Sequence, residues 1–300
     1  MSQIYDLRSY IHALETAGQQ TTINQPVGLT HELADVAATL ARQGQGPVLF
    51  RAPEFPGNLP VRQPLHWPVF TNAVVNPTCA ALALGCPVSE VPTRMGAAQE
   101  PANGIQSRVV DEKPKWKENI LTGEQINLYD LPIPTHGKHD GGPFITGGVT
   151  VCMDPVSGRG NLSYNRMQIL GPHTFGFNVN EWRHVMQFYK HQQAKDEPLQ
   201  IAIAIGLDPA VMIAAGARYD GDELAIAGAL RGAAVPVCKG HSVDVLVPLH
   251  AEIVIEGYLP PHLRRAEGPL AEFHGYYGEL WESPTFEVTA ICYRSEPIYQ

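Results

Sequence analysis

The sequence predicts an α+β fold in two parts, a small N-terminal α/β domain over residues 1–115 and a mainly β domain with inserted helices over residues 116–300. In the first ninety residues, amphipathic helical patterns alternate with short extended runs, which is typical of a small α/β domain. In the last hundred residues, apolar and β-branched runs predominate, which favours a barrel or barrel-like sheet. A chain of 300 residues is long enough to bury two cores of this kind.

The N-terminal domain has local helix signals of ordinary strength. Asp6 is a plausible N-cap for the first helix, and Gly18 supplies its end. Asn76 and Pro77 begin a later helix, which Gly85 ends. The expected helices cover residues 6–17, 30–44 and 76–85, and the expected strands cover residues 47–50 and 67–75. We interpret this domain as scaffold.

Residues 90–140 differ in character from what precedes them, because they carry many prolines and charges and show little periodicity. This pattern predicts a long connection, and connections of such length are usually functional or linking. His136 and His139 lie within it, but no third ligand follows at a convincing zinc spacing. We therefore interpret both as surface loop histidines.

The second domain begins with two strand-like runs, 145–153 and 159–170, around the turn-forming residues 154–158. Further helices are expected at residues 180–191, after Asp208-Pro209, and at 222–231, with strands at 199–206, 235–240, 244–248, 251–259 and 285–293. The last sixteen residues have the pattern of a strand still in progress. We therefore expect a shortened chain.

Composition restricts the class of protein. The chain has 21 basic and 30 acidic residues, a net charge of −9, and no basic run, which disfavours a nucleic-acid or anionic-membrane surface. No apolar run approaches the length of a membrane span, and the N-terminus lacks a signal-peptide pattern. Five scattered cysteines without a C-x-x-C pair favour reduced thiols. These features predict a cytoplasmic protein.

The stretch NLSYNR, residues 161–166, places polar side chains in a sequence that otherwise resembles a buried strand. Buried polar groups need partners, because an unpaired one is costly. The guanidinium of Arg166 suits a phosphate or a carboxylate. The alternative is a half-exposed strand whose polar side faces water.

Asn161, His184 and Glu223 are candidate metal ligands. An amide oxygen, an imidazole and a carboxylate form a rather hard set that suits Mn²⁺ or Mg²⁺ better than zinc. Their spacing does not show that they meet, and a histidine on a helix surface, such as His184, is more often simply packed or solvated. Asn161 and Arg166 are five residues apart and would face opposite sides of an uninterrupted strand. If both side chains contact the same ligand, the backbone must therefore have a bulge, a bend or a strand that begins after Asn161.

Glu267 and Glu272 form a second constellation. Gly268-Pro269 between them excludes a continuous helix, so the sequence predicts a turn or loop on which the carboxylates approach each other. A close carboxylate pair, or one near apolar rings, has a raised pKa and can deliver a proton near neutral pH. A solvated acidic loop is the alternative interpretation. The sequence contains no P-loop, G-x-G-x-x-G, G-x-S-x-G or H-E-x-x-H motif.

Taken together, several blocks in order resemble the UbiD-like decarboxylases, the reversible carboxy-lyases that use prenylated FMN. The blocks are LPIPTHGKHDGGPFIT, NLSYNRMQILG, EWRHV, DELAIAGALRG, VPVCKGHSVDVLVP, AEIVIEGYL and EGPLAEFHGYYGE. The resemblance implies a small N-terminal α/β domain and a split β-barrel of the flavin-reductase type that binds the cofactor. It also implies a C-terminal oligomerisation domain, which we expect to be absent from these 300 residues.

The resemblance implies roles for individual residues. Asn161, His184 and Glu223 would bind Mn²⁺ at the cofactor phosphate, and K⁺ would lie near Glu223 and the backbone of Ala214 and Ala215. Cofactor contacts would come from Tyr164, Asn165, Arg166, Asn178, Val179, Asn180, Arg183 and His184. Arg166, Glu267 and Glu272 would form the catalytic ionic network, with Glu272 as proton donor.

The implied activity is decarboxylation of an aromatic or α,β-unsaturated carboxylic acid. A flavin prenyltransferase would supply the cofactor, and the chain would assemble as a homo-oligomer or with a partner subunit. Two positions depart from the family pattern, since Ala271 replaces a usual glycine and Val243 a common asparagine. Two other hypotheses stay open at this point. The chain is a non-catalytic or incomplete subunit that needs a partner, or it is an ordinary FMN-dependent oxidoreductase, which gives the Glu267 and Glu272 pair no role.

Overall fold

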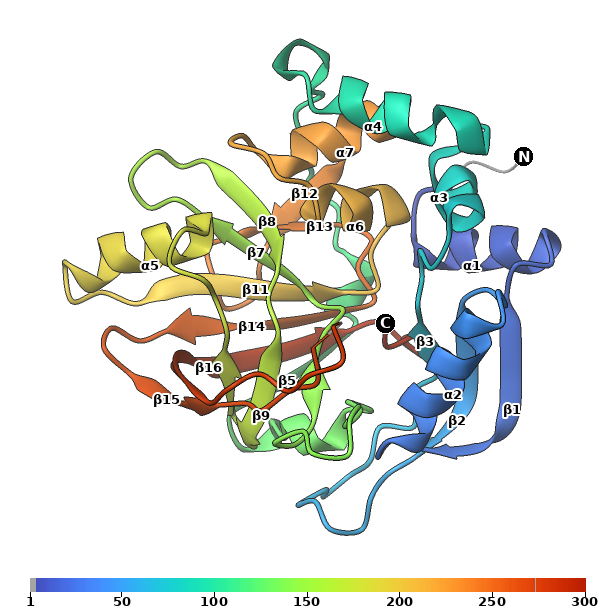
Figure 1. Cartoon of the computed structure of the whole chain (residues 1–300). Coiled ribbons are helices and arrows are strands. Elements are labelled where there is room, and N and C mark those ends of the chain that lie inside the picture. Colours follow the sequence, from blue (N-terminus) through green and yellow to red (C-terminus); the bar gives the residue numbers. More distant parts are fainter. Residues whose placement is uncertain (1–3, 273) are drawn as a thin grey trace.

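The computed structural model describes residues 4–272 and 274–300, and it shows the expected α+β architecture (Figure 1). The N-terminal part, blue in Figure 1, contains a three-stranded sheet in the order β1-β2-β3. Strands β1 and β2 are parallel, whereas β2 and β3 are antiparallel. The elements are α1 (Leu7–Thr16), β1 (Thr21–Gly28), α2 (Glu32–Arg42), β2 (Val48–Glu54), β3 (Val69–Thr71) and α3 (Pro77–Leu84).

Local capping explains where two of these helices begin. The Asp6 carboxylate accepts the Ser9 backbone N–H at 2.8 Å, and the Ser9 side chain returns a bond to form a capping box. Asn76 accepts the backbone N–H of Cys79, and Gly85 ends α3 in the left-handed conformation. The caps predicted at Asp6 and Asn76 are therefore confirmed. Strand β1 was not predicted, and only residues 69–71 of the expected 67–75 strand pair with a neighbour.

The second part is organised around a ten-stranded sheet, whose main path is β6-β9-β10-β16-β14-β11-β7-β8. Strands β5 and β15 both pair with the long strand β16. The strands are β5 (Asn119–Thr122), β6 (Phe144–Ile145), β7 (Val149–Met153), β8 (Gly160–Tyr164), β9 (Met167–Gly171), β10 (Thr174–Phe177), β11 (Leu199–Ile205), β14 (Ile253–Leu259), β15 (Arg264–Glu267) and β16 (Trp281–Tyr293).

The predicted hairpin around residues 154–158 is confirmed, because β7 and β8 pair antiparallel across it. The run expected at 159–170 is not one strand, because pairing stops after Tyr164 and resumes at Met167. The helix expected at 180–191 begins only at His184, since residues 178–183 form a loop. That loop and the break after Tyr164 both belong to the candidate site described below.

Helices cover one end of the sheet, where α3, α4, α6 and α7 lie together (Figure 1). They accompany a third sheet, in the order β13-β12-β4. The elements at this end are α4 (Val91–Ala98), β4 (Arg108–Val109), α6 (Pro209–Ala215), α7 (Glu223–Arg231), β12 (Pro236–Lys239) and β13 (Leu246–Pro248). Helix α5 (His184–Gln193) lies apart from them and contacts β11 (Figure 1). Short 3-10 helices occupy residues 88–90, 101–103, 115–117, 123–125 and 128–130.

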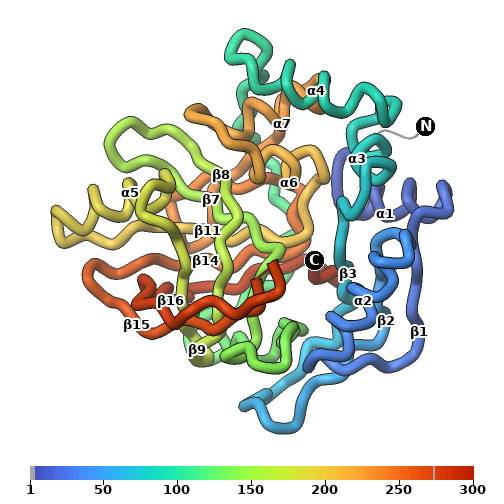
Figure 2. Tube along the Cα trace, viewed as in Figure 1, coloured from blue at the N-terminus to red at the C-terminus, as the bar shows by residue number. Residues whose placement is uncertain are grey.

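The connection over residues 90–140 is more ordered than the sequence predicts. It contains α4, and its short strands β4 and β5 join sheets of the second part by pairing with β12 and β16. The trace in Figure 2 follows this segment from the helical end to the lower part of the barrel. The sequence did not predict these strands for two reasons. The segment is rich in proline, and strands of two to four paired residues leave little periodicity to detect.

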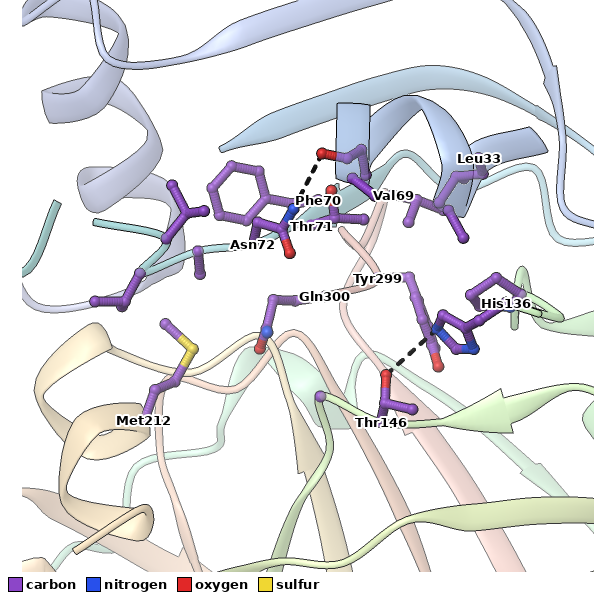
Figure 3. A pocket seen from close by; sticks show the side chains of 18 of the residues that line it. Leu33, Val69, Phe70, Thr71, Asn72, His136, Thr146, Met212, Tyr299 and Gln300 are labelled. Carbon is purple, nitrogen blue, oxygen red and sulfur yellow. Dashed lines mark hydrogen bonds between the residues drawn. The ribbon is translucent and has the colours of Figure 1, made fainter. Parts of the chain in front are cut away.

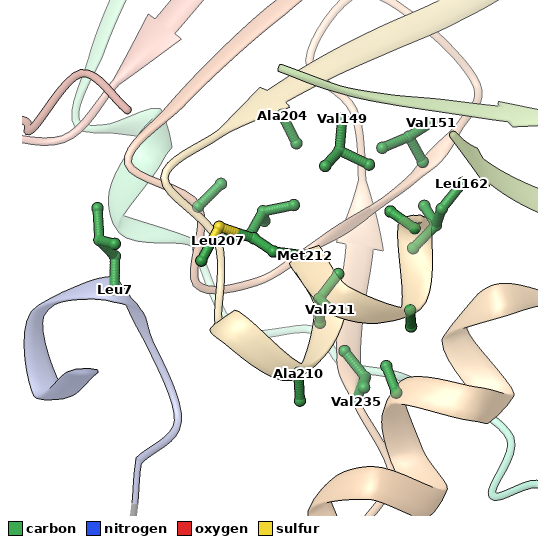
Figure 4. Packing of buried hydrophobic residues seen from close by; sticks show 14 of the residues in the cluster. Leu7, Val149, Val151, Leu162, Ala204, Leu207, Ala210, Val211, Met212 and Val235 are labelled. Carbon is green, nitrogen blue, oxygen red and sulfur yellow. The ribbon is translucent and has the colours of Figure 1, made fainter. Parts of the chain in front are cut away.

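Two apolar cores hold the chain together, and each draws side chains from both halves of the sequence. In the first, Leu7 of α1 belongs to the same cluster as Val149 and Val211 of the second part (Figure 4). The buried Glu252 adds a polar link, because Arg8 and Arg294 both bind its carboxylate at 2.9 Å. The boundary between residues 115 and 116 stays a prediction. Within the described residues, no helix combines the length and apolar character that crossing a membrane requires.

Candidate active site

Arg166 lies in the break between β8 and β9. Its side chain therefore does not follow the alternation between the two faces of the sheet. The break meets the requirement set by the five-residue spacing from Asn161, because Arg166 is not part of the strand that carries Asn161. The backbone carbonyl of Arg166 accepts the Asn178 N–H at 3.1 Å, which ties this break to the end of β10. The guanidinium is partly buried, with 14% of the side chain exposed.

The Arg166 guanidinium joins the two predicted carboxylates. Its Nε and Nη2 donate to Oε1 and Oε2 of Glu267 at 2.9 and 3.2 Å. Its Nη1 donates to Oε1 of Glu272. The planar fork thus serves one carboxylate with two donors and the other with a third, an arrangement that lysine cannot reproduce.

Glu267 is the buried member of this cluster, with no exposed side-chain surface. It ends strand β15 and does not lie on a loop, which corrects the expectation that both acids share a turn. Asn178 Nδ2 donates to its Oε2 at 2.8 Å, so three donors stabilise the carboxylate. A Cβ at Gly176 would lie 2.9 Å from Cγ of Glu267, so the glycine makes room for this side chain.

Glu272 is the accessible member, with 34% of its side chain exposed. It lies in the loop between β15 and β16, where its backbone N–H donates to the Tyr276 carbonyl at 2.9 Å. Its pairing with Arg166 removes the solvated-loop alternative for this residue. The cluster therefore has an inner carboxylate fixed by three donors and an outer carboxylate open to water.

A relay of polar side chains links this cluster to the candidate metal ligands. Ser163 Oγ donates to Asn165 Oδ1 at 3.0 Å, and Asn165 Nδ2 donates to the Asn178 carbonyl at 3.2 Å. Asn161 Nδ2 lies 3.5 Å from Ser163 Oγ at the other end. Asn161, Ser163 and Asn165 are all buried, so the polar side of β8 faces inward and not toward water.

The three candidate metal ligands line one cavity of about 490 Å³. Nδ1 of His184 and Oδ1 of Asn161 lie 3.0 Å apart. Glu223, at the first turn of α7, accepts the backbone N–H of Leu162 at 2.8 Å, directly beside Asn161. Burial raises the pKa of Glu223 to about 7, because the carboxylate has lost solvation.

The lining of this cavity combines possible ligands of a divalent cation with basic side chains that would offset the charge of a phosphate. Arg183 and Arg218 contribute positive charge, Asp220 contributes negative charge, and helix α5 begins at His184. No trio of histidine, cysteine, aspartate or glutamate side chains suited to a metal occurs within residues 4–272 and 274–300. The amide oxygen of Asn161 offers a third ligand beside His184 and Glu223. Ala215 lines the same cavity, near the expected potassium position.

The other predicted cofactor residues lie around this cavity or near it. Tyr164 packs against α6, where its hydroxyl donates to the Met212 carbonyl at 3.1 Å. Val179 and Asn180 lie in the loop that leads to α5, and the Asn180 carbonyl accepts the Arg183 N–H at 3.0 Å. This bond shapes the turn that delivers Arg183 and His184 to the cavity.

A larger cavity of about 580 Å³ lies between the N-terminal sheet and the barrel, and it does not contain the metal candidates (Figure 3). Leu33, Val69 and Phe70 form apolar walls on one side, and Tyr164 and Met212 line the other. Gly216 lines both cavities, so the two spaces adjoin at the end of α6.

His136 borders the larger cavity and is not simply a surface histidine. Its Nδ1 is buried and has no hydrogen-bond partner among the described residues, and burial lowers the pKa of the imidazole. Nε2 lies 3.5 Å from the Thr146 hydroxyl (Figure 3). His139, by contrast, is exposed as predicted.

Sequence reasoning missed several residues that complete the site. Ser163 bridges Asn161 and Asn165, although only its position within NLSYNR pointed to it. Gln168 accepts the Gly268 N–H at 2.6 Å, and Asp140 accepts the Ala271 N–H at 3.0 Å. The sequence around Gln168 and Asp140 does not indicate these roles, because the bonded residues are 100 and 131 positions apart.

Comparison with known families matches both parts of the chain. Residues 108–300 match the UbiD family model, described as the 3-octaprenyl-4-hydroxybenzoate carboxy-lyase Rift-related domain. Residues 11–99 match the model for the N-terminal domain of the same carboxy-lyase.

Solved structures of UbiD-class enzymes superpose over nearly the whole chain. An evolved dimeric form of HmfF from Pelotomaculum thermopropionicum, in complex with prFMN, is 35% identical with a TM-score of 0.89, covering 98% of this chain and 66% of that one. The apo 3,4-dihydroxybenzoic acid decarboxylase from Enterobacter cloacae is 29% identical, with a TM-score of 0.88 and coverage of 100% and 65%. The closed form of vanillic acid decarboxylase from Sedimentibacter hydroxybenzoicus is 26% identical, with a TM-score of 0.90 and coverage of 100% and 64%. This chain therefore spans about two thirds of the length of these structures.

Proposed function

Because the chain belongs to the UbiD family of carboxy-lyases, we propose that it carries the cofactor-binding and proton-transfer machinery of a prenylated-FMN-dependent decarboxylase. The reaction is the reversible, non-oxidative decarboxylation of an aromatic or α,β-unsaturated carboxylic acid. One observation carries this proposal: Arg166 is held between a buried and an accessible carboxylate, and hydrogen bonds link that cluster to a cavity suited to a phosphate and a metal ion.

The two carboxylates are placed for different tasks. Glu267 has three donors and no exposed surface, so it stays paired with Arg166 and fixes the orientation of the guanidinium. Glu272 accepts one hydrogen bond from Arg166 and is open to water. It can therefore take up a proton from solvent and deliver it to the carbon that loses CO₂. Bound prenylated FMN supplies an acceptor for the electron pair that remains when the C–C bond breaks.

The cavity at β8 and α5 would hold the phosphate of the cofactor. Asn161, His184 and Glu223 offer the oxygen and nitrogen ligands that Mn²⁺ accepts, and Arg183 offsets the phosphate charge. Binding of a divalent ion would also stabilise Glu223 as a carboxylate, reversing the effect of burial on its pKa. From the family resemblance we propose that K⁺ binds near Glu223 and the backbone of Ala214 and Ala215; Glu223 and Ala215 line the same cavity.

The apolar walls of the larger cavity support an aromatic or unsaturated substrate. Phe70, Val69 and Leu33 offer a surface without charge, and Tyr164 brings that surface next to the cofactor residues of β8. Apolar walls with a few polar groups are usual for sites that bind small organic molecules.

A second candidate function is that of a flavin-binding subunit that needs further polypeptide for turnover. It is favoured by the coverage, since the matched structures extend well beyond the part that this chain superposes on. A partner subunit would supply that polypeptide, and the chain would assemble with it or as a homo-oligomer. We place the protein in the cytoplasm, where a flavin prenyltransferase supplies its cofactor.

The test is to produce the chain together with a flavin prenyltransferase, identify the bound flavin by mass spectrometry, and follow CO₂ release from a panel of aryl and acrylic acids. Prenylated FMN with CO₂ release supports the first proposal. Prenylated FMN with CO₂ release only after coexpression with a candidate partner supports the second. Oxidation of NAD(P)H by a protein that carries unmodified FMN would contradict both, since it is the behaviour of an ordinary flavin oxidoreductase.

A further inference from the structure

We propose that Asp140 is a positioning residue that fixes the Glu272 loop against Arg166 through the backbone N–H of Ala271. This inference rests on the proposed function, because it takes Glu272 as the proton donor. Asp140 lies in the loop of residues 136–142, more than 120 residues away in sequence, and nothing in the ionic cluster itself requires it.

Among its described residues, the loop that carries Glu272 contains no helix or strand. Residues 268–272 and 274–280 belong to the connection from β15 to β16, and the turn around Glu272 is closed by short-range bonds within the loop, such as Glu272 N–H to the Tyr276 carbonyl and Gly275 N–H to the Glu272 carbonyl. Such a turn can keep its own shape and still move as a unit. Its position therefore depends on what joins it to the barrel.

Among the hydrogen bonds of the described residues, three join this loop to residues 136–142. Asp140 Oδ1 accepts the Ala271 N–H at 3.0 Å, one residue before Glu272. The Gly141 N–H donates to the Pro269 carbonyl at 2.9 Å, and the His139 N–H donates to the Tyr277 hydroxyl at 3.0 Å. Of the three, only the first uses a charged side chain and lies next to the proton donor.

Asp140 is itself held rigidly. Its Oδ2 accepts the Gly137 N–H at 2.6 Å, and its own N–H donates to the Gly137 carbonyl at 3.1 Å. Each carboxylate oxygen thus serves a different loop, one closing the turn at Gly137 and the other holding Ala271. Asparagine would place an NH₂ group where one of the two oxygens now accepts an N–H, so it cannot maintain both bonds in this arrangement.

The close approach of the two loops depends on glycine at 137. A Cβ there would lie 2.6 Å from the Tyr277 hydroxyl and 3.2 Å from the Ala271 methyl group. The missing side chain therefore accommodates Ala271, the residue that departs from the family pattern. The two loops are packed as a pair, with the Asp140 carboxylate at their junction.

The experiment compares Asp140→Asn with Asp154→Asn as a matched control. Asp154 also uses its two oxygens for two donors in a turn, the Val156 N–H and the Ser157 hydroxyl, but it lies in the β7–β8 hairpin. Hydrogen exchange is measured on the protein without cofactor, in a peptide that contains Ala271 and Glu272. We expect exchange about tenfold faster in Asp140→Asn, the effect of losing one bond to a charged group, and unchanged in the control.

The same variants are assayed with cofactor bound. Asp140→Asn should lower kcat by about tenfold with little change in KM, because the substrate-binding walls are untouched while the proton donor is misplaced. Asp140→Glu, which keeps two acceptor oxygens, should restore part of the exchange protection and of kcat. Tyr277→Phe removes the uncharged hydrogen bond from the His139 N–H to the Tyr277 hydroxyl. It should also speed hydrogen exchange and lower kcat, but by less than Asp140→Asn.

Each result decides between the inference and the proposed function. Unchanged exchange at Ala271 in both Asp140→Asn and Tyr277→Phe overturns the inference, whatever the activity. Faster exchange with undiminished kcat also overturns it, provided that Glu272→Gln is inactive. If the wild-type protein with bound prenylated FMN releases no CO₂ from any acid, either alone or with a candidate partner, the proposed function fails, while the exchange data still decide whether Asp140 holds the loop.

Discussion

Replacing Glu272 by glutamine keeps the size of the side chain but removes its transferable proton, whereas the same change at Glu267 disturbs a buried ion pair. We expect Glu272→Gln to bind flavin and metal normally and to lose turnover by about 10²–10⁴, the usual contribution of a positioned general acid. Glu267→Gln should instead lose stability and retain less cofactor. The two variants therefore separate chemistry from structure within one cluster.

The structure gives the size of each effect on stability. Glu272 is 34% exposed and shares one donor of Arg166, so solvent screening limits its ion pair to about 1 kcal/mol or less. Glu267 is fully buried and accepts two bonds from Arg166 and one from Asn178. Glutamine would leave part of that donor set without an acceptor, at roughly 3–5 kcal/mol. For a domain of this size, that loss lowers the melting temperature by about 10 °C.

The assay measures CO₂ release, bound flavin absorbance and thermal unfolding on the same preparations. Turnover by Glu272→Gln at the wild-type rate would falsify the proton-donor role. Equal melting temperatures for Glu267→Gln and the wild type would contradict the claim that the inner carboxylate holds Arg166. If wild-type activity needs a partner chain, all three proteins are compared in the completed complex.

Three further predictions follow from burial and donor chemistry. Asn161→Leu should weaken Mn²⁺ binding by roughly 100-fold or more, measured by calorimetric titration, and unchanged affinity would exclude the amide as a ligand. Burial lowers the pKa of His136, so the unfolded chain takes up a proton near pH 6.5 while the folded one stays neutral. The free energy of unfolding therefore falls as the pH falls below that value. Urea unfolding at pH 7.5 and 5.5 should show a smaller difference between the two pH values in His136→Asn than in the wild type. The exposed His139→Asn is the control and should keep the wild-type difference. Gly176→Ala should cost about 1–3 kcal/mol, because its Cβ would lie 2.9 Å from Glu267 Cγ, and an unchanged urea midpoint would contradict this.

Much of this protein is determined by local sequence. Asp6 and Asn76 begin helices because their side chains cap the first turn, an interaction that spans three residues. The residues of the ionic cluster could also be named, because Arg166, Glu267 and Glu272 lie in blocks that resemble a known family. Local patterns failed for β1, whose polar and proline-containing sequence becomes a strand only by pairing in parallel with β2.

Tertiary structure decided how the named residues are used. Arg166 meets its two carboxylates from the break after β8, and the roles of those carboxylates follow from burial, which leaves Glu267 inside and Glu272 accessible. The contribution of Asp140 was invisible in the sequence, since its partner is a backbone N–H about 130 residues away. A backbone group has the same chemistry at every residue, so only the fold can show which N–H a side chain holds.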